Sequence, residues 1–153
     1  GKLKELRSLL DTTKVHIAIS LHNPFSAERA AIMPVERAYP IRDVIALLSN
    51  YDFSHQRRLS FEYIMWRDVN DSIRYAEALV KLIGRLDCRV NLIRFHAIPG
   101  SDLRPSTTQV MERFRDCLND HGITATIRAS RGEDIMAACG MLAGKATAEA
   151  ATE

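Results

Sequence analysis

A strand-like segment is followed by a helix-like segment four times along the chain, and this alternation restricts the possible folds most strongly. The strand candidates are short, largely apolar runs at positions 15–20, 59–65, 90–95 and 123–128, and the first of them is rich in β-branched residues. Between them, apolar residues recur at spacings of three and four, which predicts amphipathic helices. Repeated β-α units imply a parallel sheet with right-handed crossovers. We therefore expect an α/β protein with about four parallel β-α units, either an open sheet or part of a barrel.

The helix boundaries are predicted from capping residues and stop signals. One helix begins after Pro40, and a second spans residues 73–83 and ends at Gly84. The run from Ser106 to Gln109 has the form of a capping box and opens a third helix. A last short helix is predicted over residues 135–143.

The length and composition indicate one globular domain, residues 1–153, with a frayed tail over residues 145–153. The chain is 46% hydrophobic and 26% charged, which argues against a disordered class. A membrane-spanning helix needs roughly 18 consecutive apolar residues, and no such run occurs, so we expect no membrane contact. The first residues lack the apolar core of a signal peptide. Three scattered cysteines fit a reducing compartment, so the expected location is cytoplasmic.

Polar and mainly cationic side chains recur where the predicted strands end. Ligands of parallel α/β folds bind beyond the carboxyl ends of the strands, so this rim could hold an anionic or nucleotide-like ligand. For any single residue, a loop side chain that satisfies its own backbone is the simpler interpretation. The rim candidates are Ser20, His22, Asn23, Glu62, Tyr63, Arg67, Asp68, Asn91, Arg94, His96, Arg128, Ser130 and Arg131.

Among the cysteines, Cys139 is the best candidate for a nucleophile. It lies between small residues soon after the arginine-rich rim, and nearby arginines lower a thiol pKa. A buried helical cysteine fits the same pattern equally well. Cys88 and Cys117 are expected to be buried small hydrophobes. The sequence contains no Gly-rich phosphate loop, no His-Glu-x-x-His and no zinc-type spacing, so no metal site is predicted in this chain.

Several segments together resemble the C-terminal part of the radical S-adenosylmethionine (SAM) RNA methyltransferases of the RlmN/Cfr family, most closely its RlmN branch. The resemblance covers roughly residues 15–144, and its most specific piece is the RGEDIMAACG segment at 131–140. The other matching segments are Ser20-Leu21-His22, Met33-Pro34-Val35, Tyr39-Pro40-Ile41, Phe61-Glu62-Tyr63, Val69-Asn70-Asp71-Ser72, Cys88-Arg89-Val90-Asn91-Leu92-Ile93 and Pro99-Gly100.

The resemblance implies a fold and an activity. The fold is the second half of a (β/α) barrel of the radical SAM type. The activity is methylation of C2 of an adenine in 23S rRNA and in tRNA, with SAM and a [4Fe–4S] cluster as cofactors. Cys139 aligns with the cysteine that one SAM methylates, giving an S-methylcysteine intermediate. A radical formed from a second SAM then activates this methyl group for addition to the adenine.

The resemblance also assigns SAM contacts. Ser20, Leu21 and His22 match the SAM-binding end of a strand, and His96 stands where the family usually has an asparagine contact. Imidazole can still make one hydrogen bond there. The family's CxxxCxxC cluster motif and Gly-Glu-Pro segment do not occur in this sequence. We therefore expect a fragment that begins inside the barrel, takes no cluster of its own and is inactive alone.

Two further expectations concern partners. Arg128 and Arg131 are predicted to contact the RNA backbone beside Cys139, with pairing to Glu133 and Asp134 as the alternative. An incomplete barrel would leave an open strand edge, so copies of the chain are expected to associate through that side. Alternatively, an N-terminal helix with its leucines at helical spacing, over residues 3–10, covers the gap.

Two other functions remain open from the sequence. One is a non-catalytic RNA-binding module on the same scaffold, which would leave Cys139 without a chemical role. The other is a related radical SAM activity that methylates C8 of adenine.

Overall fold

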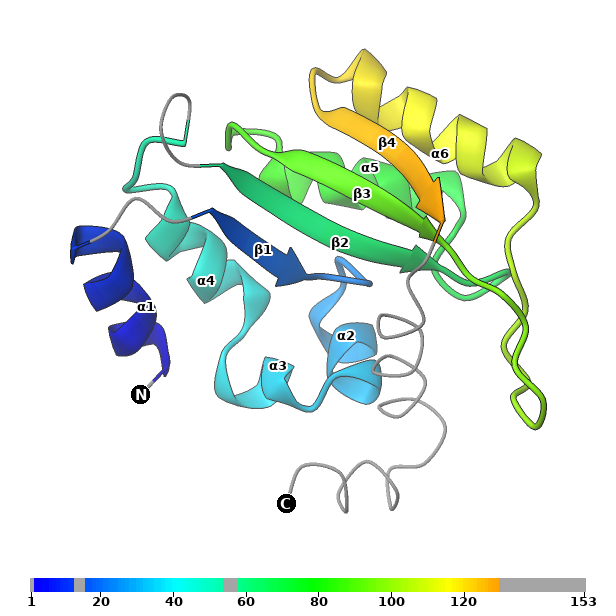
Figure 1. Cartoon of the computed structure of the whole chain (residues 1–153), viewed down its shortest axis with the longest axis horizontal. Helices are drawn as coiled ribbons and strands as arrows, with labels where there is room; N and C mark the ends of the chain where they lie inside the picture. Colours follow the sequence, from blue (N-terminus) through cyan, green and yellow to red (C-terminus); the bar gives the residue numbers. More distant parts are fainter. Residues whose placement is uncertain (1, 13–15, 54–57, 130–153) are drawn as a thin grey trace.

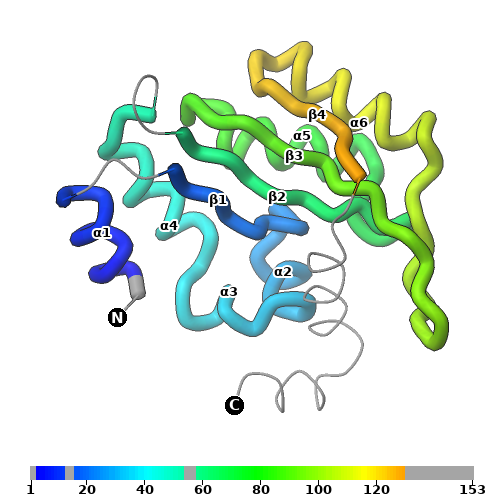
Figure 2. The backbone as a smooth tube through the Cα atoms, in the orientation of Figure 1, coloured from blue at the N-terminus to red at the C-terminus, as the bar shows by residue number. Residues whose placement is uncertain are grey.

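A parallel β-sheet of four strands, in the order β1-β2-β3-β4, forms the centre of the molecule (Figure 1). The computed structural model describes residues 2–12, 16–53 and 58–129. Figure 2 shows the strands side by side in chain order, with helical returns between them. This topology confirms the predicted α/β class with parallel β-α units. The strands are β1 (Ile17–Ser20), β2 (Leu59–Met65), β3 (Arg89–Arg94) and β4 (Thr124–Ala129).

Three amphipathic helices cover one face of this sheet. They are α4 (Ile41–Leu48), α5 (Ile73–Ile83) and α6 (Thr108–Asp120), and Figure 1 shows α5 behind the strands. Two short helices, α2 (Ser26–Ile32) and α3 (Val35–Ala38), lie beside the carboxyl end of β1 (Figure 1).

The main hydrophobic core lies between the sheet and these three helices. Phe61, Tyr63 and Leu92 point to this side and are completely buried, because alternate residues of a strand face the same way. The rings of Tyr63 and Phe114 pack together with their centroids 5.3 Å apart, which joins β2 to α6. Burial of such side chains contributes roughly 1.5–3 kcal/mol each, so this face supplies most of the stabilising apolar contact.

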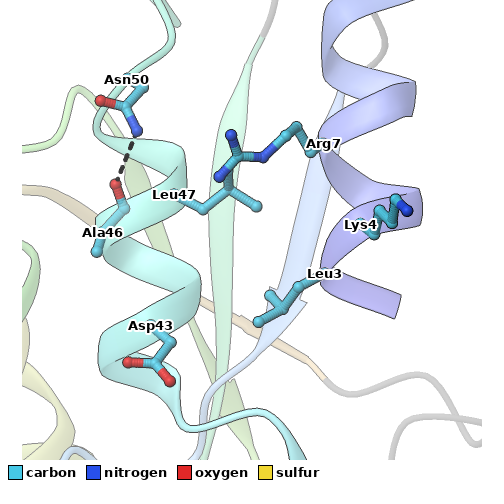
Figure 3. A pocket seen from close by; sticks show the side chains of 7 residues that line it. All are labelled: Leu3, Lys4, Arg7, Asp43, Ala46, Leu47 and Asn50. Atoms are coloured by element: carbon cyan, nitrogen blue, oxygen red, sulfur yellow. Dashed lines mark hydrogen bonds between the residues drawn. The ribbon is translucent and has the colours of Figure 1, made fainter. Parts of the chain in front are cut away.

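The N-terminal helix α1 (Lys2–Thr12) packs beside α4. Leu10 is buried in the main core, and the Tyr51 hydroxyl donates a hydrogen bond to Asp11 over 2.6 Å. A pocket of about 440 Å³ separates the two helices, and Leu3, Arg7 and Asp43 are among the side chains that line it (Figure 3). The predicted N-terminal helix therefore exists and is anchored to the main core.

The predicted strand boundaries are correct to within one or two residues, but the predicted cap of α6 is wrong and two short helices were missed. The capping residue of α6 is Thr107, whose hydroxyl accepts a hydrogen bond from the amide of Val110; Ser106, the predicted cap, instead donates to Asp71. Helices α2 and α3 were not predicted, because they are too short to show a repeated apolar spacing. The helix expected over residues 135–143 and the tail over 145–153 lie outside the described residues.

Candidate functional site

The second face of the sheet carries a row of polar side chains at one level of the strands. The parallel register places Ser20, Glu62, Asn91 and Thr126 opposite one another across all four strands. The Asn91 amide donates to Glu62 over 3.2 Å, and the Thr126 hydroxyl donates to Asn91 over 3.3 Å. We call these four residues, together with Arg128 two positions farther along β4, the polar row.

An ion pair joins Glu62 on β2 to Arg128 on β4, across the intervening strand β3. The Arg128 guanidinium donates to the Glu62 carboxylate over 3.0 Å, with side-chain exposures of 30% and 20%. Partial exposure weakens such a pair through solvent screening, so its stabilising contribution is about 1 kcal/mol at most. The predicted pairing partners Glu133 and Asp134 lie outside the described residues. Arg128 is therefore positioned by the sheet itself, through a partner the sequence did not indicate.

The polar row is unusual for this kind of sheet. Parallel sheets are normally covered on both faces, and their strands are then apolar on both sides. Here the helix-facing positions follow that rule, while Glu62, Asn91 and Arg128 on the other face are only half-buried. Carboxylate, amide, hydroxyl and guanidinium groups together can bind a ligand that has both charged and hydroxyl groups.

A second, smaller hydrophobic cluster borders the polar row toward the carboxyl ends of the strands. Ile64 and Ile93 pack there against Ile32 and Met33, at the end of α2. Trp66 belongs to the same cluster and is completely buried, yet its indole N–H meets no acceptor in the described part of the chain. An unpaired buried donor costs about 1–3 kcal/mol.

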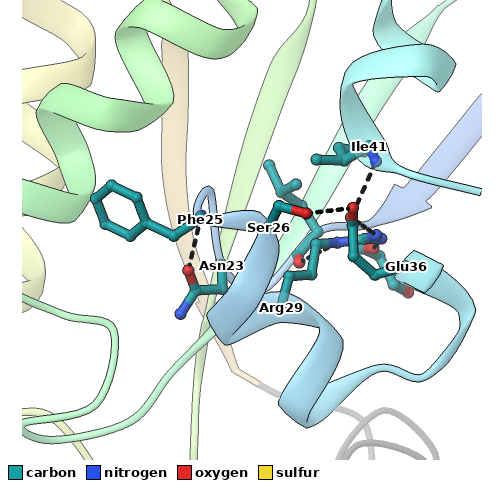
Figure 4. Close-up of polar contacts among 8 residues, drawn as sticks. Asn23, Phe25, Ser26, Arg29, Glu36 and Ile41 are labelled. Carbon is teal, nitrogen blue, oxygen red and sulfur yellow. Dashed lines mark hydrogen bonds and ion pairs between the residues drawn. The ribbon is translucent and has the colours of Figure 1, made fainter.

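A buried arginine holds the carboxyl end of β1 (Figure 4). The Arg29 side chain donates to the carbonyl of Leu21 over 3.0 Å and to the carbonyl of Ser20 over 2.9 Å. Its third contact is an ion pair of 2.7 Å with Glu36, and the two side chains are 5% and 2% exposed. Each nitrogen of the guanidinium thus donates to an acceptor, as a buried charge requires.

Glu36 extends this network to the neighbouring helices. Its carboxylate also accepts hydrogen bonds of 2.9 Å from the Ser26 hydroxyl and from the backbone amide of Ile41 (Figure 4). Ser26 begins α2 and Ile41 begins α4, so one ion pair connects β1, α2, α3 and α4. The backbone that carries Ser20 and Leu21 is therefore fixed by residues that the sequence analysis did not single out. The only sequence signal for this pair was two opposite charges seven residues apart, which is not specific to a buried ion pair.

His22 follows β1 in a left-handed backbone conformation, with φ of 58°. Its side chain is buried, and Nδ1 accepts a hydrogen bond of 3.0 Å from the amide of Ile64. This contact fixes the orientation of the ring and joins the end of β1 to β2. The ring also packs edge-to-face against Trp66, with centroids 5.8 Å apart.

Asn70 completes the connection between the strand ends. Its amide nitrogen donates to the carbonyls of His22 and Ile64, both over 2.8 Å, and its side-chain oxygen accepts from the amide of Trp66. The Tyr63 hydroxyl donates to the Asn70 carbonyl over 2.7 Å. Burial, the largest cause, raises the pKa of Tyr63 well above its usual value. Tyr63 thus belongs to the core and not to the predicted polar rim.

The remaining predicted site residues are distributed unevenly. The side chain of Ser20 is exposed, Leu21 is buried, and His96 is exposed just after β3. The described residues therefore bring Ser20, Leu21 and His22 together, with His96 on a neighbouring loop of the same edge. Cys139 and Arg131 lie outside the described residues.

The two described cysteines differ in burial. Cys88 is buried at the start of β3, and this burial raises the pKa of its thiol to about 12. Cys117 is only half-buried; burial also raises the pKa of its thiol, with nearby Glu77 as a smaller cause. The prediction of a buried cysteine is thus correct for Cys88 and only partly correct for Cys117. In the ranges 2–12, 16–53 and 58–129, no three potential metal-ligating side chains come together.

No helix in the described part of the chain is long and apolar enough to cross a membrane.

Comparison with known proteins relates this arrangement to one family. A probable dual-specificity RNA methyltransferase RlmN from Bacteroides fragilis is 58% identical over 142 residues, which are 93% of this chain and 41% of that protein. The dual-specificity RNA methyltransferase RlmN of Gluconobacter oxydans is 47% identical over 133 residues, or 86% of this chain and 33% of that protein. The chain thus spans about two fifths of the length of the curated relatives it matches.

Solved structures agree with these relatives. A radical SAM methyltransferase from Sphaerobacter thermophilus superposes with a TM-score of 0.78 at 38% identity, covering 91% of this chain and 41% of that one. A domain of a pyruvate-formate lyase-activating enzyme from Bacteroides vulgatus shares the fold, with a TM-score of 0.64 at 15% identity over 82% of this chain and 74% of that one. No model of a protein family matches the sequence. From the identity to its relatives and the shared fold, the chain matches part of the RlmN proteins and of a radical SAM methyltransferase of known structure.

Proposed function

We propose that this chain forms part of a cytoplasmic radical SAM methyltransferase that modifies C2 of an adenine in 23S rRNA and in tRNA. The observation that carries the proposal is its 58% identity, over 142 residues, to a protein named as a dual-specificity RNA methyltransferase. The catalytic residue of the proposal is Cys139, which would carry the methyl group to the RNA.

The residues of the β1 end and the polar row fit SAM chemically. SAM carries a carboxylate, an ammonium group and ribose hydroxyls, and the row offers the hydroxyl of Ser20, the carboxylate of Glu62 and the guanidinium of Arg128. Ser20, Leu21 and His22, with His96 across the edge, would hold the molecule. When bound, SAM supplies the methyl group and the radical chemistry that moves it. The role of the chain's own residues is to fix the strand end, through Arg29 and Asn70, so that this geometry is preformed.

A [4Fe–4S] cluster does not fit the described residues. Such a cluster takes cysteine thiolates as ligands. Cys88 and Cys117 both have raised pKa values and so favour the neutral thiol, and no third metal-ligating side chain joins either of them in the described part of the chain. In this proposal the cluster ligands lie outside the 153 residues.

Arg128 and Arg131 remain the proposed contacts to the RNA backbone. Arg128 already pairs with Glu62, so a phosphate would have to replace or share that carboxylate. Because the two side chains are 30% and 20% exposed, breaking the ion pair costs little free energy, and a phosphate can take the place of the carboxylate.

A chimera tests the proposal. This chain replaces the matching segment of the Bacteroides fragilis relative, and methylation of 23S rRNA and tRNA is followed by mass spectrometry of the nucleosides. We expect 2-methyladenosine from the chimera and none from its Cys139→Ala variant, while SAM cleavage persists in that variant. The control variant, Cys117→Ala, keeps methylation because it changes a half-buried helix side chain.

Other outcomes point elsewhere. Methylation that survives in Cys139→Ala would remove the assigned role of this cysteine. Formation of 8-methyladenosine would assign the C8 activity, and RNA binding without any methylation would assign the non-catalytic module.

Association between copies of the chain belongs to the same proposal. β1 and β4 each pair with a single neighbour in the described sheet, so each has one open edge. Open edges tend to pair with another chain, and a two-fold dimer is the commonest arrangement. Light scattering of the 153-residue chain at several concentrations should show a dimer, and a monomer at every concentration would contradict this expectation.

A further inference from the structure

A groove with a cationic lining lies on the outer side of the helical layer, between α4 and α5. Its volume is about 550 Å³. The ionisable side chains that line it are Arg42 of α4, Lys81 of α5 and Arg85 just after α5, and all three are positively charged. Its apolar lining includes Ile45 and Leu82. The groove therefore offers positive charge beside apolar surface.

No carboxylate forms an ion pair with Arg42, Lys81 or Arg85 in the described part of the chain. Asp43 lines the separate pocket between α1 and α4 (Figure 3). Glu77 lies one helical turn before Lys81 on α5, on the flank toward Cys117 of α6, and the described structure shows no ion pair between Glu77 and Lys81. Glu28 accepts hydrogen bonds from Tyr75 and Asn23. The positive charge of the groove is thus not neutralised by these neighbours.

One end of the groove reaches the edge of the sheet that carries the proposed site. Pro24 and Phe25 line this end, and only Asn23 separates them from His22 in the sequence. The guanidinium of Arg74 stacks over the Phe25 ring at 4.3 Å from its centroid, which adds a fourth cation beside the groove. This end of the groove therefore lies near the carboxyl end of β1, which carries part of the proposed site.

We propose that this groove binds the RNA substrate outside the modified adenine, with backbone phosphates on Arg42, Lys81 and Arg85 and a base or ribose on the apolar lining near Phe25. Proteins that bind single-stranded RNA combine a cationic groove with an aromatic surface in this way. The inference rests on the proposed function for the identity of the polymer. It adds a second contact surface on the helical layer, separate from the polar row and from Cys139.

The test compares two pairs of charge reversals in the 153-residue chain. Lys81→Glu with Arg85→Glu removes two groove cations, whereas Arg113→Glu with Arg115→Glu makes the same change in net charge on α6, outside the groove. Lys81, Arg85 and Arg113 are exposed, while Arg115 is half-buried and pairs with Asp116, so circular dichroism checks that both variants fold. Affinity for a short single-stranded RNA is measured as a function of salt concentration.

We expect the groove variant to bind RNA about tenfold more weakly near physiological salt and to lower the slope of log K against log salt by roughly 1.4, since two phosphate contacts are lost. The α6 variant should keep the native slope. Equal losses in the two variants would overturn the proposal, because they would reflect net charge alone. The native chain could also bind a polyglutamate peptide as tightly as it binds RNA. If only the groove variant lost that binding, the groove would be assigned to an acidic protein segment instead.

A second readout separates this inference from the proposed function. In the chimera, the groove variant should raise KM for RNA and leave kcat unchanged at saturating RNA. A chimera with a native groove that methylates no RNA would contradict the proposed function while the binding data still test the groove. A groove variant with unchanged KM in an active chimera would reject the groove alone.

Discussion

The two faces of the β-sheet have the same backbone and opposite chemistry. The face toward α4, α5 and α6 is apolar and closed, with Phe61, Tyr63 and Leu92 completely buried. The other face carries the polar row, whose Glu62 and Arg128 remain partly exposed. Because stability comes from the first face, the second can keep groups that contribute little to folding. Polar side chains that stability does not require are the strongest structural sign of a ligand surface in this chain.

The largest effect on stability is expected at the carboxyl end of β1, which Arg29 holds in place. Arg29→Met should destabilise the chain by about 3–5 kcal/mol, because it leaves the Glu36 carboxylate buried without its partner. Urea denaturation measures the change. Arg37→Met, an exposed arginine of the adjacent α3, should change the stability by less than about 0.5 kcal/mol. A small loss in Arg29→Met would mean that the edge relaxes and is not preformed.

Truncations on the two faces test the contrast directly. Phe114→Ala should cost about 3–5 kcal/mol, because it opens a cavity beside Tyr63 in the covered core. Thr126→Ala on the open face should cost less than about 1 kcal/mol, since its hydroxyl is exposed. Urea midpoints of the two variants provide the comparison, and similar losses would show that the open face also supports the fold.

The covered face should also make the stability sensitive to alkaline pH. The thiol of Cys88 keeps its proton in the folded chain up to a pKa of about 12, whereas in the unfolded chain it is lost near pH 8.5. Because the pKa of this thiol is higher in the folded chain, its contribution to stability is complete at pH values below the unfolded pKa. This contribution is lost as the pH rises from about 8.5 toward 12. Between pH 7 and pH 10 the loss should be about 2 kcal/mol. Cys88→Ala should lose less over the same interval, and equal losses would contradict the assignment.

The smallest effect on stability is expected on the open face. Glu62→Gln should cost at most about 1 kcal/mol, because the pair with Arg128 is partly exposed. In the chimera, the same change should weaken SAM binding measured by calorimetry, since the row loses its carboxylate. Thr124→Ser, at an exposed position of β4, serves as the control. A variant that loses stability and keeps SAM affinity would reverse the roles given to the two faces.

The sequence predicts the sheet well, because each strand is marked by its own short, largely apolar run. Glu62, Asn91 and Arg128 were also identified as polar residues near strand ends. Their alignment into one row was not predictable, since it depends on the register between strands that lie about 30 residues apart in sequence.

The support of the β1 end was the main omission. Arg29 and Glu36 read as surface charges in the sequence, because charged residues are rarely buried unless they are paired. Their pairing depends on α2 and α3, which have no clear periodic signal. Tyr63 was misplaced for a related reason: a hydroxyl suggests exposure, and only the structure shows that the Asn70 carbonyl satisfies it.

The bridging role of Asn70 has a consequence for motion. The amide of Ile64 donates to His22, while Asn70 joins the carbonyls of both residues, so these strand ends separate only if all three contacts break together. Such a cooperative unit opens rarely, and its amide protons exchange with solvent slowly. The amide of Ile64 should therefore be among the most protected in hydrogen exchange, although it lies next to the edge proposed to bind ligand. A ligand that binds at this edge would then meet strand ends that stay fixed, and only the surrounding loops would change conformation.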